Sequence, residues 1–506
     1  MLAISKAISL VGLTGHLIDV EADIGNGVPG FNLLGLPDAA LSEARDRVRS
    51  AIINSGAQWP NKRITLALSP AALPKRGSAF DCAIALALLA AAEQISLERV
   101  SSAVILGELT LDGRIKSIPG ILPALRAASL AGVTRAVVPV ENFREGVLVA
   151  GIELFAFANL ESLIAWCRGG DYENISLANE SNNENERTSI DFSDIAGQES
   201  AKEAIEIGAV GGHHIAMVGP PGVGKSMLAE RIPTILPTLN ESDSLEVTSL
   251  HSIAGRISPE NHSPLISIPP FIAPHHTITR AGLIGGGASV ISPGACSLAH
   301  RGILFLDEAP EISRPVIESL REPMELGEVT LTRLGRSATY PSRFTLVLAA
   351  NPCPCGWSIG KAKRCTCTAL ASRRYREKLS GPILDRIDLR IELEPLSQAD
   401  LLRAGESSSV IAARVRAARA RAEVRFRNLP WSVNSEIPAS ALRNQFAPER
   451  KALAPLYKAL DSEEITVRGL HRIQRVAWSI ADLSGENSPS LLSINRALSL
   501  HLRERL

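Results

Sequence analysis

The sequence predicts an α/β protein divided into about three domains, and three observations support this prediction. The chain has 506 residues, whereas a single domain commonly contains about 100–200 residues. Short β-rich runs alternate with helical stretches over the first 170 residues, and a glycine-rich turn follows an apolar strand that ends at Val218. From about residue 397 onward the apolar pattern is entirely helical. We therefore expect domains at residues 1–170, 191–396 and 397–506.

The composition is that of a globular protein rather than a fibrous or disordered one, because 45% of the residues are apolar and 21% are charged. The longest apolar run, residues 82–92, is too short to cross a bilayer. The N-terminus also lacks a charged segment followed by a cleavable apolar stretch. We therefore expect a cytoplasmic protein with no membrane partner.

Basic and acidic residues balance at 53 each, but they are unevenly distributed along the chain. Residues 171–190 carry five acidic side chains and one basic side chain and are rich in Asn and Ser, so we interpret them as a linker. Residues 401–506 carry 17 basic and 10 acidic side chains. This excess of positive charge is a modest indication of a polyanionic partner.

The expected elements follow from these patterns in chain order. In the first domain we expect strands at 64–68, 103–106 and 136–140 and helices at 41–55, 81–92 and 122–131. In the second we expect a helix at 199–210, strands at 214–218, 303–306 and 345–350, and a helix beginning at Met227. In the third we expect a helix with an apolar stripe that packs into the core. The stripe is Ile411, Val415, Ala418, Ala422 and Phe426. Arginines flank this stripe and indicate a solvated face or a subunit interface.

The glycine-rich turn after the strand at 214–218 fits the pattern G-x-x-x-x-G-K-[ST] and predicts an ATP site. Glycines let backbone N–H groups converge on the phosphates, Lys225 supplies positive charge to the β- and γ-phosphates, and the Ser226 hydroxyl completes a Mg²⁺ shell. The expected ATP-binding residues are Gly219, Pro220, Pro221, Gly222, Val223, Gly224, Lys225, Ser226 and Met227.

Two later strands end in polar residues suited to ATP hydrolysis. The strand at 303–306 runs into Asp307, expected to hold the Mg²⁺ shell, and Glu308, expected to orient or deprotonate the attacking water. The strand at 345–350 ends at Asn351, which we expect to align that water, although an Asn before Pro352 is also a common turn former. Together the three motifs predict a nucleotide triphosphatase that uses ATP and Mg²⁺.

Four of the seven cysteines lie within fifteen positions, at Cys353, Cys355, Cys365 and Cys367. Four thiolates can form a tetrahedral zinc site, and such a cluster suits a metal better than a secreted disulfide framework. The spacing is C-x-C rather than the usual C-x-x-C, so reduced, unliganded cysteines are the alternative to Zn²⁺.

Several longer strings resemble the AAA+ ATPases and, among them, the magnesium-chelatase-like branch called the YifB or ComM family. The strings are PHHTIT at 274–279, AGLIGGG at 281–287, LAHRG at 298–302, NPCPCG at 351–356 and GPILDRID at 381–388. The resemblance covers essentially the whole chain. It implies an AAA+ P-loop α/β domain with an all-helical lid.

The resemblance also implies roles for two arginines. Arg386 resembles the arginine finger that reaches the γ-phosphate bound by a neighbouring subunit, and Arg468 resembles the second sensor on the lid. The alternative for each is a surface ion pair. A finger that acts on a neighbour implies a ring, which we expect to be a homo-hexamer.

The first domain resembles the α+β domain that carries proteolysis in Lon proteases, through the strings at 74–81, 107–114 and 138–142. The catalytic serine and lysine of those proteases fall here on Ala79 and Leu122, which can neither attack a carbonyl nor activate a nucleophile. Ser78 is adjacent, but no lysine replaces Leu122. We therefore expect a non-proteolytic domain that assists ring assembly or contacts nucleic acid.

Two segments resemble loops that line the central channel of AAA+ helicases. One is a glycine-rich insert at 271–295, which carries Arg280, and the other is a hairpin whose turn carries Arg333 and Arg336. Arginines at the tip of such a hairpin bind phosphates without reading base sequence. The alternative is a solvated hairpin turn.

Three functions are compatible with ATP hydrolysis, and we rank a DNA motor first. The pore arginines favour it, and the resemblance extends it to helicase activity and branch migration of joint molecules during natural transformation. A protein-remodelling ATPase ranks second, because the pore segments lack the aromatic-hydrophobic loop of unfoldases. A metal-chelatase motor ranks last, since it is not expected to carry the first domain or the cysteine cluster.

Overall fold

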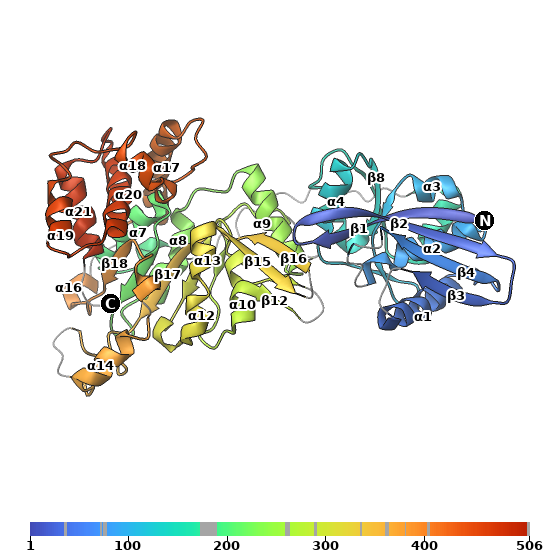
Figure 1. Cartoon of the computed structure of the whole chain (residues 1–506), viewed down its shortest axis with the longest axis horizontal. Coiled ribbons are helices and arrows are strands. Elements are labelled where there is room, and N and C mark those ends of the chain that lie inside the picture. The colour runs from blue at the N-terminus through green and yellow to red at the C-terminus, as the bar shows by residue number, and fades with distance from the viewer. Residues whose placement is uncertain are drawn as a thin grey trace.

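The computed structural model describes residues 1–34, 38–70, 73, 78–172, 190–258, 264–287, 291–333, 336–359, 364–379, 381–401 and 405–502. Most of the expected linker, residues 173–189, lies outside these ranges. A mixed-sheet region lies at one end of the molecule, a parallel-sheet region in the middle and a group of helices at the other end (Figure 1). No helix in the described ranges is long and apolar enough to cross a membrane.

Residues 1–172 contain a seven-stranded sheet in the order β3-β4-β2-β1-β5-β8-β9. Its strands are β1 (Leu2–Val11), β2 (Thr14–Gly25), β3 (Gly30–Leu34), β4 (Arg63–Ser69), β5 (Val104–Ile105), β8 (Arg135–Pro139) and β9 (Glu153–Phe157). β2 pairs antiparallel with β1 and β4, and the other pairs are parallel. A separate short hairpin is formed by β6 (Glu108–Leu109) and β7 (Ile115–Lys116).

Helix α2 (Asp81–Ala91) forms the centre of this region, because all of its residues are buried. Its many alanines allow the helix axis to approach β1 and β2 closely. The other helices are α1 (Asp38–Asn54), α3 (Leu97–Ser101), α4 (Ile121–Leu130), α5 (Phe143–Gly146) and α6 (Leu160–Cys167). The three strands and three helices expected here are confirmed to within a few residues, whereas β1, β2, β3 and β9 were not predicted.

The middle region is built on five parallel strands in the order β11-β14-β17-β10-β18. They are β10 (Ile215–Val218), β11 (Phe271–Ile272), β14 (Ile303–Leu306), β17 (Thr345–Ala350) and β18 (Leu389–Glu392). β10 and β14 are buried throughout, which is typical of parallel strands covered by helices on both faces. The predicted strands at 214–218, 303–306 and 345–350 are therefore confirmed.

Helices and short strands surround this sheet. The helices are α7 (Glu199–Gly211), α8 (Lys225–Ile235), α9 (Glu241–Ile253), α10 (Arg280–Ile284), α11 (Ala295–Leu298), α12 (Arg314–Glu318), α13 (Arg321–Leu326), α14 (Ala369–Arg376), α15 (Gly381–Leu384) and α16 (Gln398–Leu401). The short strands are β12 (Gly285–Gly286) and β13 (Ser292–Pro293), and the hairpin is β15 (Glu328–Arg333) and β16 (Arg336–Pro341). The helix expected to begin at Met227 is α8, which begins two residues earlier, at Lys225.

The described residues from 405 to 502 contain only helices and connecting segments: α17 (Ser408–Arg425), α18 (Ala439–Arg443), α19 (Ala454–Asp461), α20 (Val467–Ser484) and α21 (Leu491–His501). The predicted stripe on α17 is buried. The flanking arginines, which were expected on a solvated face or at a subunit interface, also form ion pairs within the chain. Arg414 forms ion pairs with Glu206 and Glu406, and Arg425 pairs with the buried Asp482.

The first and middle regions meet at the turn between β1 and β2. Leu13 packs there against a small apolar cluster that contains Leu250, Ala338 and Tyr340. At Gly12, which has φ +62°, an added Cβ would lie 2.9 Å from the carbonyl oxygen of Thr339 on β16. The hairpin β15–β16 therefore rests on the N-terminal region.

His214, immediately before β10, is held in its neutral form. Its Nδ1 accepts a hydrogen bond of 3.0 Å from the backbone N–H of Leu346 on β17, so this nitrogen carries no proton. Burial, together with the positive charge of Arg472, lowers the pKa of His214 to about 4. Protonation of this ring therefore opposes pairing of β10 with β17.

We expect the free energy of unfolding to fall as the pH drops from about 6.5 to about 4, because the unfolded chain binds a proton at His214 that the folded chain excludes. This residue contributes at most about 3 kcal/mol to the loss. His214→Asn keeps an acceptor oxygen but does not titrate, so its urea-unfolding midpoint should change less over this range than that of the wild type. Parallel pH curves for the two proteins would contradict this account.

Candidate nucleotide-binding site

Three parallel strands bring the predicted catalytic segments to one edge of the sheet. Val218 at the end of β10 pairs in register with Ala350 at the end of β17, and Leu306 at the end of β14 pairs with Leu348. The phosphate-binding loop (residues 219–224), Asp307 and Asn351 each follow directly after one of these strand ends. Segments that are far apart in the sequence therefore meet at this edge.

The phosphate-binding loop has the backbone conformation that an anion site needs. Gly222 and Gly224 have φ of +78° and +94°, values that favour glycine. Gly224 is also the N-cap of α8, so the free N–H groups at the start of this helix face the loop. The residues present therefore fit a bound triphosphate.

Lys225, the first residue of α8, is largely buried, and its side chain reaches back to this loop. Its Nζ donates hydrogen bonds to the carbonyl oxygens of Gly219 and Pro220, at 2.6 and 3.0 Å, and to Oδ1 of Asn351 at 3.0 Å. Burial lowers the pKa of Lys225, and the nearby carboxylates of Asp307 and Glu308 oppose this shift. The structure thus brings Lys225 and Asn351 together, as a shared nucleotide site requires.

Ser226 and Asp307 also meet. The Ser226 hydroxyl donates a hydrogen bond of 2.9 Å to Oδ2 of Asp307. A hydroxyl and a carboxylate at this distance can bind one small cation together, so the pair fits Mg²⁺, which prefers oxygen ligands.

Glu308 has a strained backbone and a partner that the sequence analysis did not identify. Its φ is +48°, which is uncommon for a residue other than glycine and is often found at functional sites. Its Oε2 lies 3.1 Å from Nδ1 of His276. His276 belongs to the PHHTIT string, and the paired histidines were the only signal in the sequence that marked it.

The two predicted arginines lie together, apart from the phosphate-binding loop. Arg386 is largely buried and forms an ion pair with Glu325, and its guanidinium also donates to the carbonyl oxygen of Pro382. Arg386, Glu325 and Arg468 line one cavity of about 240 Å³, and none of residues 219–227 lines it. Nothing in the sequence pattern indicated Glu325 as the partner of Arg386.

The structure also brings the predicted DNA-contacting segments together. Arg280 is exposed at the first position of α10, and Arg333, at the end of β15, donates a hydrogen bond to the carbonyl oxygen of Gly287 in the insert. The backbone of Arg336 pairs with Arg333 in the hairpin, but its side chain lies outside the described part of the structure. The insert and the hairpin therefore form one surface with at least two arginines.

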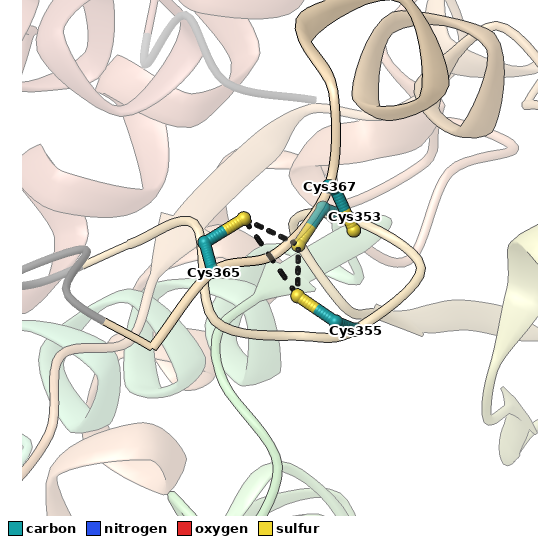
Figure 2. Close-up of side chains that lie close together, drawn as sticks. All are labelled: Cys353, Cys355, Cys365 and Cys367. Carbon is teal, nitrogen blue, oxygen red and sulfur yellow. Dashed lines mark hydrogen bonds between the residues drawn. The ribbon is translucent and has the colours of Figure 1, made fainter.

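The four clustered cysteines follow the end of β17, and their sulfur atoms face one another (Figure 2). The Sγ atoms of Cys353, Cys355 and Cys365 are 3.4 to 3.9 Å apart, and all four sulfurs lie within 4.8 Å of one another. Backbone N–H groups of Trp357 and Thr366 lower the pKa of the Cys355 thiol to about 6.

The cysteine segment touches the phosphate-binding loop. Gly356 follows the first cysteine pair with φ +81°, and an added Cβ there would lie 2.6 Å from Cδ of Pro221. Asn351 is also close, at 3.8 Å from the same position. The position of this segment therefore constrains the loop.

Comparison with known proteins shows that the chain is similar in sequence to magnesium chelatase subunits. The family described as "Magnesium chelatase, subunit ChlI" matches residues 191–401, "Subunit ChlI of Mg-chelatase" matches 20–142, and "Magnesium chelatase, subunit ChlI C-terminal" matches 405–501. An uncharacterised protein of Mycobacterium tuberculosis is 47% identical, over 98% of both chains. The protein YifB of Escherichia coli is 37% identical and the competence protein ComM of Haemophilus influenzae 35% identical, each over 100% of this chain and 98% of the relative.

We expect Gly356→Ala to weaken ATP binding by about tenfold, comparable to the loss of about one hydrogen bond to the phosphates. The new methyl group would push Pro221, although Gly356 is not itself a predicted phosphate ligand. Gly132→Ala is the matched control, because Gly132 has a similar φ of +80° but nothing within 4 Å of the added Cβ. Titration with a fluorescent ATP analogue measures the effect, and equal affinities of the two variants would show that the contact is unimportant.

Proposed function

The chain belongs to the YifB and ComM family of magnesium-chelatase-like proteins, and we propose that it is an ATP-hydrolysing ring motor that acts on DNA. ATPase activity is the family-level role. The observation that carries the DNA proposal is the single surface formed by the insert and the hairpin, which is joined to the ATP site through His276.

Each group at the sheet edge has one task in this proposal. Lys225 neutralises the β- and γ-phosphates, while Ser226 and Asp307 hold Mg²⁺. Glu308 orients and deprotonates the attacking water, and Asn351 aligns it. ATP bound with Mg²⁺ supplies the energy of phosphoryl transfer.

The placement of the arginines supports ring assembly. Arg386 and Arg468 share a cavity that the phosphate-binding loop does not reach, so we assign both to the ATP of a neighbouring subunit. Until a neighbour docks, Glu325 holds Arg386 against its own chain. We propose a homo-hexamer as the closed ring, with DNA passing through its centre.

Arg280, Arg333 and Arg336 contact the DNA backbone in this proposal. Guanidinium groups bind phosphate oxygens without reading bases, as a motor that moves along any sequence requires. His276 lies four residues before Arg280 and contacts Glu308. Displacement of the insert by DNA therefore has a direct route to the water-activating carboxylate.

The similarity to the competence protein ComM supports a task in natural transformation. We assign to the ring the branch migration of recombination intermediates, which takes place on DNA in the cytoplasm. The N-terminal region serves as a non-proteolytic support. Leu122 is fully buried, and the Ser78 hydroxyl donates to the carboxylate of Glu108 rather than to an activating base such as lysine.

Steady-state ATP hydrolysis with and without single-stranded, forked and four-way-junction DNA tests the proposal. We expect DNA to raise the rate of the wild type and Lys225→Ala to be inactive throughout. The double variant Arg333→Ala/Arg336→Ala should keep its basal rate and lose most of the stimulation. The surface variant Arg135→Ala, whose arginine pairs with exposed Glu153, should behave as wild type.

The salt dependence of DNA affinity shows whether the double variant has lost contacts to phosphates or has been damaged structurally. Loss of two contacts to single-stranded DNA should reduce the slope of log affinity against log salt by about 1.4. A rate that DNA does not change but unfolded protein raises would replace the DNA motor with a protein-remodelling ATPase.

We expect His276→Ala to lower the ratio of the ATPase rates measured with and without DNA by about tenfold, the equivalent of one charge-assisted hydrogen bond. The neighbouring His275→Ala is the control, because Nδ1 of His275 bonds to Thr277 and not to Glu308. If both variants keep the wild-type ratio, His276 does not couple the insert to the ATP site.

A further inference from the structure

We propose that Cys353, Cys355, Cys365 and Cys367 bind one Zn²⁺ ion as a site of four thiolates, and that this ion fixes the segment after β17 against the phosphate-binding loop. Metal binding is independent of the proposed function, whereas the effect on the loop rests on it.

The sulfur positions fit a tetrahedral metal centre. A zinc–sulfur bond of about 2.3 Å places sulfur atoms about 3.8 Å apart at the corners of a tetrahedron. The sulfur atoms of Cys353, Cys355 and Cys365 are 3.4, 3.7 and 3.9 Å apart. A disulfide needs about 2.0 Å, so these pairs are spaced for a shared metal ion rather than for a covalent bond.

The surroundings of the cluster supply hydrogen-bond donors and leave one side of the site open. Backbone N–H groups of Trp357 and Thr366 point at Sγ of Cys355, and the guanidinium of Arg364 lies over the ring of Trp357 at 5.3 Å. Cys353 is fully buried, whereas the other three cysteines are partly exposed, so one side of the site is open for metal entry. Four soft sulfur ligands without oxygen or nitrogen select Zn²⁺ over Mg²⁺ or Ca²⁺.

The remaining cysteines are a contrast within the same chain. Cys82, Cys167 and Cys296 are each buried, and none of them belongs to a group of possible metal ligands among the described residues. Burial raises the pKa of the Cys167 thiol to about 12. These three thiols are therefore packing residues, and they provide internal controls.

A metal at this site joins two ends of one loop. Cys353 and Cys355 follow Asn351 and precede Gly356, which contacts Pro221, while Cys365 and Cys367 precede Thr368, the N-cap of α14. The ion therefore anchors the segment next to Pro221 to a helix. Without the ion, the described contacts between the two cysteine pairs are sulfur–sulfur contacts and backbone N–H···S hydrogen bonds.

The first experiment measures zinc in the purified full-length protein by mass spectrometry and by release to a colorimetric chelator during titration of the thiols with a mercurial. We expect about one zinc per chain, released as four thiols react. Cys355→Ser/Cys365→Ser should lose the zinc, whereas Cys296→Ala should retain it. Wild-type protein that stays below about a tenth of a zinc per chain after exposure to Zn²⁺ would overturn the metal site, whether or not the variants fold.

The second experiment compares ATP-analogue binding by the wild-type protein before zinc removal, after removal and after zinc is restored. We expect removal to weaken binding by about tenfold and restoration to recover it. Equal affinity in all three states would overturn the effect on the loop. If the protein binds the analogue in none of the three states, the proposed nucleotide site is wrong. The measured zinc content then still tests the proposed metal site.

Discussion

Parallel pairing of β10, β14 and β17 is the constraint on which the candidate site depends. Parallel strands end at the same edge, so one register fixes the phosphate-binding loop, Asp307 and Asn351 relative to one another. The strands are buried on both faces, so a slip in register would move apolar side chains out of their packing positions. The buried core that stabilises the fold therefore also positions Lys225 and Ser226 for their hydrogen bonds to Asn351 and Asp307.

Local motifs could be predicted from the sequence because their chemistry is contained in a few consecutive residues. The loop at 219–226 needs glycines, a lysine and a hydroxyl in one turn, and the apolar run at 303–306 followed by two acids is equally self-contained. The structure brings these segments together, as a shared ATP site requires. The cysteine cluster was predictable for the same reason, since short spacing limits how far the thiols can separate.

Features that depend on contacts between distant segments could not be predicted. Ion pairs such as Arg386 with Glu325 and His276 with Glu308 join residues that no local pattern relates. Strand β1 was missed because its buried positions include Ala3, Ser5 and Ala7, whose small or polar side chains hide the alternation expected of a half-buried strand. Its stability comes from pairing with β2 and packing on α2, neither of which is visible in the strand itself.

The turn at Gly12 and Leu13 has a mechanical consequence for the hairpin. Leu13 shares an apolar cluster with Ala338 and Tyr340, and Gly12 permits close contact with the backbone of β16. A two-stranded hairpin is only marginally stable in water by itself, so packing against the N-terminal region stabilises this one. Contacts with the turn at Gly12 and Leu13 therefore support the hairpin that carries Arg333, although this turn lies more than three hundred residues earlier in the sequence.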